Sequence, residues 1–347
     1  MLIPQSRRRF MTKMAYASAL GLGGFGFSNI GRTAGSAAGD APPEITTVRV
    51  EMDPVICNAP QVFEELLRAE GFTDVRYIQL SQEHVQKADA VNMGPVTKML
   101  ADGEVDFARD FAATLILSLE AKAQVTILTG LHLGCFEVFA KNDIQKVSDL
   151  RGKTVGYGVG DKPLLTILAN FIGLDPKEVN WYPAALADPI EAFAAGKIDA
   201  YLFLPPALQE VKSRNIGHVL ASQIVDRPWS QYYCCMLATR TEFARKYPVA
   251  TKRVMRAVLK GADLCASEPK QTAERLVGRG SPRYDYALQM LNEVRFDVWR
   301  DYDPEDTVRF YSLRLQEVGE IRSSPQQIIN NGTDWRFLNE LKHELKV

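Results

Sequence analysis

The chain has 347 residues, of which 46% are hydrophobic, 24% charged and 9% aromatic. This composition is ordinary for a globular protein and excludes a wholly disordered chain, a collagen and a coiled coil. The length is enough for two domains or for one large one. The formal net charge is −1, and no basic run occurs beyond the first 39 residues, which excludes the charge pattern of a nucleic-acid-binding protein.

The N-terminus has the three parts of an export signal. The first 39 residues hold five basic side chains and no acidic one. Removing those five from the 41 lysines and arginines leaves 36 against 42 acidic side chains, so the remainder carries about −6. The basic part is followed by a charge-free, glycine-rich apolar stretch (14–30) and by small residues (34–38). This order is typical of a signal that is removed, and we expect the mature protein to begin at about residues 37–42.

The basic part, Ser6-Arg7-Arg8-Arg9-Phe10-Met11, resembles a bacterial twin-arginine signal, whose pattern is Ser-Arg-Arg-x-Phe and an apolar residue. The resemblance implies export to the periplasm by a route that carries folded proteins. The apolar stretch of 17 residues falls short of the ~20 that span a bilayer, so we expect no membrane anchor. No cysteine precedes Cys57 to take a lipid. The alternative interpretation is a disordered basic leader.

Beyond the leader, β-branched segments alternate with amphipathic ones, which predicts an α/β fold. The apolar spacing predicts strands at 45–51, 75–80, from 105 and at 125–129, and helices at 60–70, 96–101 and 112–121. From residue 241 onward the pattern becomes mostly helical, with periodic segments at 249–265, 284–294 and 335–345.

A short internal echo suggests two similarly built lobes. Residues 101–106 (ADGEVD) are similar to residues 194–199 (AAGKID). Each segment is typical of a helix end, a glycine cap and the start of a strand. Chance could also supply so loose a match, because only six positions are involved.

Three alternate glycines, at 156, 158 and 160, precede a helical segment. Their spacing is neither G-x-G-x-x-G nor a P-loop, so it does not predict a nucleotide site. Gly158 and Gly160 would allow a ligand to approach the backbone, and Asp161 could cap a helix whose free N–H groups face a polar ligand. The alternative is a plain strand-to-helix turn.

Catalytic and metal-binding patterns are poor. The four histidines form no HExxH motif, and no G-x-S-x-G is present. A nucleophilic pair of His132 and Cys135 is imaginable, but a histidine at a strand end is more often structural. The five cysteines (57, 135, 234, 235, 265) form no CxxC pair and are expected to be buried small hydrophobes. We therefore expect no catalysis, no metal and no cofactor.

Two further segments leave alternatives open. Arg109 and Asp110 interrupt an apolar strand end, where charges are costly unless they pair with each other or contact a ligand. Residues 228–233 (PWSQYY) combine aromatic and polar groups and form either a stacking wall for a flat ligand or a rigid corner of the core.

The motif at residues 148–158 (SDLRGKTVGYG), the two echoed units and the helical C-terminal part resemble the periplasmic solute-binding proteins of ATP-driven (ABC) importers. The likeness is greatest to the nitrate/sulfonate/taurine group, which shares its fold with thiamine-pyrimidine precursor proteins. It implies a type II periplasmic binding protein fold, α/β, with two lobes joined by hinge strands near 139–142 and 234–238. Lobe 1 would comprise 42–140 and 238–347, and lobe 2 would comprise 141–237.

The resemblance further implies that a solute contacts the loops that follow the strands. Carried onto this chain, the ligand-binding residues are Asp53, Cys57, Asn58, Arg109, Asp110, His132, Cys135, Gly158, Gly160, Asp161, Lys162, Pro205, Trp229 and Tyr232. We expect a monomer that captures a small organic solute (a sulfonate, an aromatic acid or a pyrimidine-like molecule) and delivers it to a membrane permease and its ATPase.

One branch of the resembling family is enzymatic. The fungal thiamine-pyrimidine synthase has a cysteine-rich iron-binding run and uses a histidine and pyridoxal phosphate. Here only Cys234-Cys235 is similar to that run, so we prefer solute binding and keep an enzyme with a metal or pyridoxal phosphate as the alternative.

Overall fold

The computed structural model describes residues 41–53, 55–89, 93–158, 160–184, 188–280 and 283–345. The twin-arginine segment and the expected cleavage region up to residue 40 lie outside the described residues. Within the described ranges, no helix is both long enough and apolar enough to cross a bilayer.

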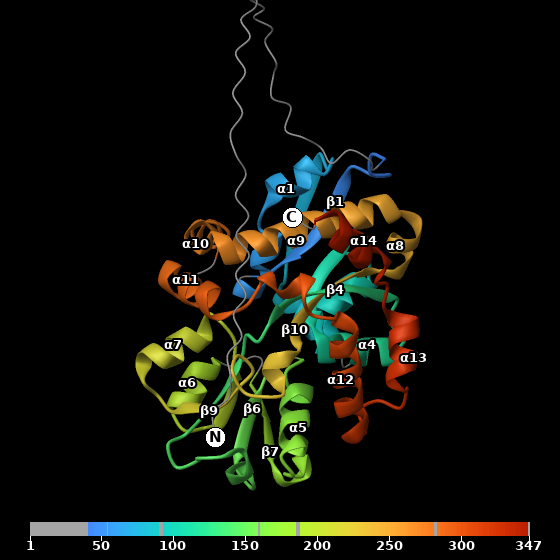
Figure 1. Cartoon of the computed structure of the whole chain (residues 1–347). Helices are drawn as coiled ribbons and strands as arrows, with labels where there is room; N and C mark the ends of the chain where they lie inside the picture. Colours follow the sequence, from blue (N-terminus) through green and yellow to red (C-terminus); the bar gives the residue numbers. More distant parts are fainter. Residues whose placement is uncertain are drawn as a thin grey trace, which may run out of the picture. The chain divides into compact units, whose positions relative to one another are not determined.

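One five-stranded sheet, in the order β2-β1-β3-β10-β4, combines the first four strands of the chain with the last one, β10 (Figure 1). β1 pairs in parallel with β2 and β3, whereas β10 lies antiparallel between β3 and β4. All residues of β3 and β4 are buried, including the charged side chains of Arg109 and Asp110 in β3. The strands are β1 (Thr47–Met52), β2 (Asp74–Gln79), β3 (Phe107–Phe111), β4 (Val125–Leu133) and β10 (Tyr233–Arg240).

The second sheet repeats this plan in the order β7-β6-β8-β5-β9. β6 pairs in parallel with β7 and β8, and β5 lies antiparallel between β8 and β9. The two echoed segments precede β3 and β8, which hold the same place in their sheets, so the echo corresponds to two sheets of one plan. The strands are β5 (Glu137–Ala140), β6 (Thr154–Tyr157), β7 (Asn180–Pro183), β8 (Ala200–Phe203) and β9 (His218–Ser222).

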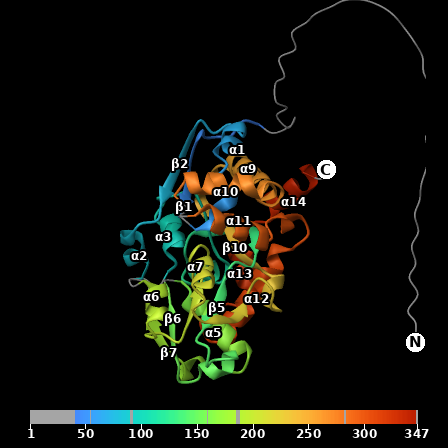
Figure 2. The same ribbon diagram turned by 90° about the vertical axis from the view of Figure 1, so that its left-hand side faces the viewer.

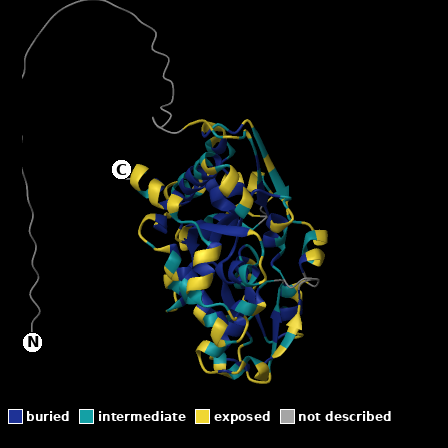
Figure 3. Ribbon diagram, turned by 90° about the vertical axis from the view of Figure 1, so that its right-hand side faces the viewer, coloured by how far each residue is buried: buried dark blue, intermediate teal, exposed yellow. Residues whose placement is uncertain are grey.

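Helices cover both sheets, and the long C-terminal helices pack mainly on the first (Figures 1 and 2). The α-helices are α1 (Glu64–Ala69), α2 (Gln82–Asp89), α3 (Pro95–Ala101), α4 (Ala112–Glu120), α5 (Lys162–Phe171), α6 (Pro189–Ala194), α7 (Ala207–Arg214), α8 (Thr241–Lys246), α9 (Pro248–Ser267), α10 (Pro269–Gly278), α11 (Tyr284–Glu293), α12 (Pro304–Glu317), α13 (Pro325–Gly332) and α14 (Arg336–Glu344). Short 3-10 turns are η1 (Ile56–Gln61), η2 (Val147–Leu150), η3 (Pro176–Glu178), η4 (Trp229–Gln231) and η5 (Asp297–Arg300). Figure 3 shows the buried residues concentrated in the strands and on the inner faces of these helices.

The expected helix at 60–70 is divided in the structure. Residues 56–61 form the fully buried turn η1, and α1 begins only at Glu64. Pro60 therefore lies inside η1 rather than at the first position of the α-helix, where its missing N–H would have been tolerated. The expected helices at 249–265, 284–294 and 335–345 are confirmed as α9, α11 and α14.

The chain crosses between the sheets at 134–136 and at 223–232. The segments that the family resemblance implies as hinges lie largely inside strands: residues 139–142 begin inside β5, and residues 234–238 lie inside β10. Their role as hinges stays a prediction. Each of these strands pairs only within its own sheet. In β5, Phe139 lies opposite Tyr201 of β8, and in β10, Cys235 lies opposite Phe111 of β3. Each crossing therefore comes just before the antiparallel strand that completes the next sheet.

Candidate functional site

The glycine loop after β6 contacts the first half of the protein. The first half means the sheet β2-β1-β3-β10-β4 with its helices, and the second half means the sheet β7-β6-β8-β5-β9 with its helices. The hydroxyl of Thr114 on α4 donates a hydrogen bond to the carbonyl oxygen of Gly160 at 3.4 Å. Gly160 has φ +85°, a conformation that favours glycine. A Cβ at Gly158 would lie 2.6 Å from Oδ2 of Asp161, so glycine is needed there for the carboxyl group to fold back on the loop.

Asp161 does not cap α5 in the expected way. It occupies the residue before the helix, but its side chain makes no capping hydrogen bond. Instead, Oδ2 accepts a hydrogen bond from the backbone N–H of Gly158 at 3.2 Å. In the described part of the chain this is the carboxyl group's one hydrogen bond, and it has no ion-pair partner there.

Two buried carboxyl groups approach each other where the two halves meet. Burial raises the pKa of Asp161 from 3.8 to about 7, and the negative charge of Asp110 raises it further, against the Gly158 hydrogen bond. Burial likewise raises the pKa of Asp110 from 3.8 to about 6, although Thr97 donates a 2.6 Å hydrogen bond to it. Both side chains are about 6% exposed. Perturbed carboxyl groups at such a junction are a binding-site signature.

The guanidinium of Arg109 belongs to an internal hydrogen-bond network on the first sheet. Its Nη2 donates to both carboxylate oxygens of Asp53, at 2.9 and 2.8 Å, and its Nε donates to Asn58 at 2.8 Å. Asn58 also donates to Asp53 at 2.7 Å and to Glu51 at 3.3 Å. Of the two alternatives for Arg109, the structure therefore favours internal pairing, but with Asp53 rather than with its neighbour Asp110.

Glu51 lies at the end of this network and is fully buried. Burial raises its pKa well above the ordinary value, and the nearby charge of Asp53 acts in the same direction. Its Oε2 has no hydrogen-bond partner among the described residues. The network thus places Arg109, Asp53 and Asn58 inside the first half, away from solvent.

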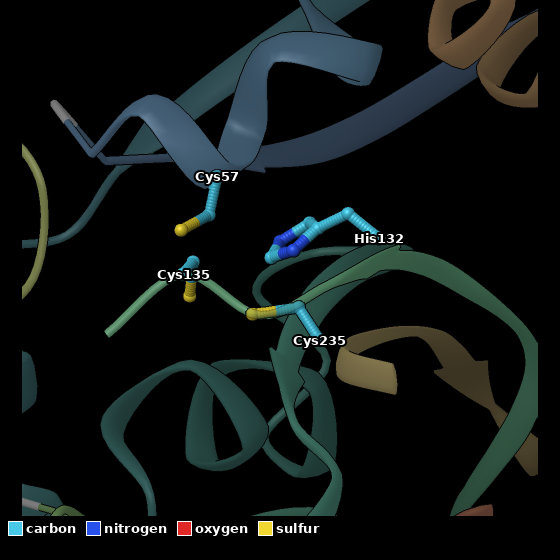
Figure 4. Close-up of side chains that lie close together, drawn as sticks. All are labelled: Cys57, His132, Cys135 and Cys235. Atoms are coloured by element: carbon cyan, nitrogen blue, oxygen red, sulfur yellow. The ribbon is translucent and has the colours of Figure 1, made fainter. Parts of the chain in front are cut away.

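Four of the expected ligand-binding or structural residues form a buried sulfur–nitrogen cluster (Figure 4). Cys57 comes from η1, His132 from the end of β4, Cys135 from the first crossing and Cys235 from β10. Their thiol sulfurs and a ring nitrogen of His132 all lie within 4.8 Å of one another, and each residue is at most 1% exposed. Three cysteines and one histidine at this distance could hold a metal ion.

Neither ring nitrogen of His132 has a hydrogen-bond partner among the described residues, although the ring is fully buried against Phe296. A buried imidazole without a partner is costly and requires an explanation. Cys234 lies beside the cluster, with its sulfur 3.0 Å from that of Cys135, and all five cysteines are free thiols. Burial raises the pKa of both Cys135 and Cys234 above the ordinary value.

The aromatic segment at 228–233 forms a packed corner in the structure. Trp229 lies edge-on to Phe171 and Phe310, at 5.4 and 5.5 Å between ring centroids. Tyr232 stacks on Phe310 at 3.9 Å with an interplanar angle of 10°. Because α12 covers these rings, the rigid-corner interpretation is the one the geometry favours.

The remaining expected residues lie elsewhere. Lys162 is exposed, with its ammonium 5.5 Å from the Tyr157 ring and 5.8 Å from the Trp181 ring, and it lines an open outer groove of about 780 Å³. Pro205 is buried after β8. Of the fourteen expected residues, the structure brings Gly158, Gly160, Asp161 and Asp110 together at the junction. Residues Asp53, Cys57, Asn58, Arg109, His132 and Cys135 belong to the interior of the first half.

Sequence reasoning missed Thr114 and the cysteine–histidine cluster, and it noted Cys235 only together with Cys234, for their likeness to an iron-binding run. The cluster's residues come from three distant segments, so no short spacing of metal-ligand type exists except His132-x-x-Cys135. Thr114 lies in an apolar helical segment and gives no signal of its own.

The model of the family described as NMT1/THI5 like matches residues 84–272, more than half of the chain. The chain belongs to the NMT1/THI5-like family. A search of curated proteins finds none that matches this family member.

Several solved structures share the fold of this NMT1/THI5-like protein. The periplasmic nitrate-binding protein NrtA from Synechocystis PCC 6803 matches with a TM-score of 0.73 and 15% identity, over 88% of this chain and 91% of that one. The alkanesulfonate-binding protein SsuA from Xanthomonas axonopodis pv. citri, bound to MOPS, has a TM-score of 0.64 and 13% identity, over 81% and 96%. SsuA from Escherichia coli has a TM-score of 0.60 and 14% identity, over 83% and 88%. The expected α/β periplasmic-binding-protein fold is therefore confirmed.

Proposed function

We propose that this protein is the extracytoplasmic solute-binding component of an ABC importer and holds a small organic solute between its two halves. Its partners are a membrane permease and the permease's ATPase, and its compartment is the periplasm, reached by the twin-arginine route. It acts as a monomer and does no chemistry on the solute. The family membership and the shared fold support this proposal.

One observation supports the site most directly: the buried carboxyl groups of Asp110 and Asp161 meet where the glycine loop contacts α4. Asp110 lies in β3 of the first sheet and Asp161 in the loop after β6 of the second, so a molecule that bonds to both would link the two halves. Burying two carboxyl groups so close together is costly without a compensating partner. A solute that offers hydrogen-bond donors supplies that partner.

The same charges narrow the class of solute. Arg109 is a cationic residue expected to contact the solute, but it already donates hydrogen bonds to Asp53 and Asn58. An anion such as nitrate would meet the carboxyl groups of Asp110 and Asp161 instead, and it is repelled whenever either group is ionised. Among a sulfonate, an aromatic acid and a pyrimidine-like molecule, we therefore favour the pyrimidine-like molecule. Its ring and amino N–H groups can donate hydrogen bonds to the carboxylates. Its ring also has acceptors for the backbone N–H groups that begin α5.

A melting-shift screen of pyrimidines, aromatic acids, sulfonates and nitrate tests the proposal, with mass spectrometry of any co-purified molecule as a complement. We expect a pyrimidine-like solute to raise the melting temperature and to be recovered unchanged. Asp161→Asn should weaken its binding roughly 10- to 150-fold, the equivalent of one buried charge-assisted hydrogen bond. Asp102→Asn, a surface carboxylate paired with Lys98, is the matched control and should bind normally.

Two results would count against the proposal. A screen in which no class of solute shifts the melting temperature would remove the binding function. A product that accumulates with time from a bound solute would instead favour the enzymatic alternative.

A further inference from the structure

The cluster of Cys57, His132, Cys135 and Cys235 has the composition of a metal site that nothing else in the fold explains. Thiolates and imidazole are the ligands that zinc and copper(I) prefer, and three cysteines with one histidine are a common set for structural zinc. The ligand atoms already lie within 4.8 Å of one another. Ligands at about 2.0–2.3 Å from a tetrahedral ion are separated by roughly 3.5–4 Å, so only a small inward movement is needed.

An independent observation on His132 points the same way. Its imidazole is 0% exposed, and both ring nitrogens lack a hydrogen-bond partner within the part of the chain that is described. A metal ion between the sulfurs would bind one of these nitrogens and remove the cost of leaving it unpaired. In Figure 4 the ring of His132 points toward the space between the three thiols.

The surroundings suit a closed site rather than an open catalytic one. All four residues are at most 1% exposed, so no coordination position faces a solvent-filled cleft. The Arg109 guanidinium is close enough to Cys57 and Cys235 to interact with both electrostatically. That positive charge, which is also paired with Asp53, would offset only part of the negative charge of three thiolates around one ion.

The position of the cluster in the topology suggests what the ion does. Cys135 lies in the first crossing between the sheets, and Cys235 lies near the start of β10, directly after the second crossing. Cys57 and His132 belong to η1 and β4 of the first half. One ion bound to all four would therefore tie both crossings to the first sheet.

We propose that Cys57, His132, Cys135 and Cys235 bind one thiophilic metal ion, zinc(II) or copper(I), in a closed four-coordinate site that fixes the base of both crossings. On binding, the three thiols coordinate as thiolates and release their protons to solvent, and the histidine coordinates as neutral imidazole. This departs from the expectation of no metal, and it does not depend on which solute the protein binds.

The test begins with mature wild-type protein purified without chelator under reducing, oxygen-free conditions. Elemental analysis should find about one zinc or copper per chain, and the metal that co-purifies distinguishes the two ions. X-ray absorption of that metal should show a shell of mainly sulfur, at about 2.3 Å for zinc. Apo protein titrated with Co²⁺ alone should develop the absorption of a tetrahedral thiolate site, which zinc then abolishes.

Variants locate the site. Cys57→Ser and Cys235→Ser should each weaken Co²⁺ binding by more than ~100-fold, because loss of a direct ligand exceeds the 10- to 100-fold effect of an outer partner. Cys265→Ser is the matched control, since Cys265 is the fifth buried free cysteine and lies outside the cluster on α9. It should bind as wild type does. Metal at a hundredfold excess over its dissociation constant should raise the melting temperature by about 4–8 °C.

Several outcomes would overturn the proposal. Wild-type protein with no stoichiometric metal and no Co²⁺ thiolate absorption would do so without reference to any variant. A metal shell of nitrogen and oxygen only, or equal loss of binding in Cys265→Ser, would also contradict it. A disulfide between Cys135 and Cys234 in metal-free protein isolated from the periplasm would assign Cys135 to a different role. None of these results bears on solute binding, so failure of the metal site and failure of the proposed function can be told apart.

Discussion

The Nη2 atom of Arg109 donates hydrogen bonds to both carboxylate oxygens of Asp53, at 2.9 and 2.8 Å. The two side chains come from β3 and from the end of β1, and both are less than 10% exposed. Burial opposes the charge on Arg109, but Asp53 keeps the pKa of the guanidinium above its ordinary value. The pair therefore stays ionised inside the protein, and each partner depends on the other.

Removing one partner of this buried pair should cost stability rather than affinity. Arg109→Ala leaves the Asp53 carboxylate without its cation, and we expect a loss of about 3–5 kcal/mol in the free energy of unfolding, measured by urea denaturation. Arg76→Ala is the matched control: Arg76 also pairs with an aspartate, Asp74, but at 60% and 40% exposure, so the loss should stay below about 1 kcal/mol. A stable Arg109→Ala protein whose solute affinity falls 10- to 150-fold would instead place Arg109 in the ligand site.

The Asp161 carboxyl group should make stability depend on pH. Its pKa is 3.8 ordinarily and about 7 in the folded protein, so the folded state binds more protons than the unfolded state between these values. The contribution of the protonated carboxyl group to the free energy of unfolding is therefore fully present below about pH 4. It is lost as the pH rises to about 7, because ionisation is less favourable in the folded state than in the unfolded state. Three pH units correspond to at most about 4 kcal/mol.

Asp161→Asn cannot titrate, so its unfolding free energy should fall less between pH 4 and pH 7 than that of the wild type. Urea denaturation at several pH values measures the difference, which separates Asp161 from other groups such as Asp110. Asp102→Asn should follow the wild-type profile, because Asp102 is a surface group. Identical profiles for wild type and Asp161→Asn would show that the folded-state pKa is not raised.

The export assignment depends on Arg7 and Arg8. Changing both to lysine keeps the charge but removes the twin-arginine pattern, so the precursor should remain inside the cell. Arg9→Lys alters only the variable position of the pattern and should be exported normally. Cell fractionation and immunoblotting measure both. Normal periplasmic accumulation of the double variant would show that a different route is used.

The fold was predictable where the sequence pattern is local. The echo of 101–106 in 194–199 predicted two sheets of one plan, and periodic apolar residues predicted α9, α11 and α14, because helix period and glycine caps are properties of short segments. The points at which the chain crosses between the sheets were not predictable from pattern. β5 and β10 are mostly apolar, and nothing in such a segment indicates which of the two sheets it joins.

The sites were less predictable because their partners are distant in the chain. Arg109 stands beside Asp110 in sequence, but alternate residues of a strand face opposite sides, so Arg109 meets Asp53 and Asp110 meets Thr97. Cys57 and Cys235 are separated by most of the chain and become neighbours only when β10 inserts between β3 and β4. Of the junction, the sequence indicated the glycine loop and Asp161 but not Thr114.

The central claim is that a solute binds between the two halves and links them. Small-angle X-ray scattering of the mature protein, titrated with the solute found in the melting-shift screen, measures this most directly. Linking the halves across Asp110 and Asp161 should shift the protein toward a closed arrangement. We predict that the radius of gyration falls and saturates at the dissociation constant measured by calorimetry. Saturating binding with an unchanged scattering curve in the wild type would contradict the account.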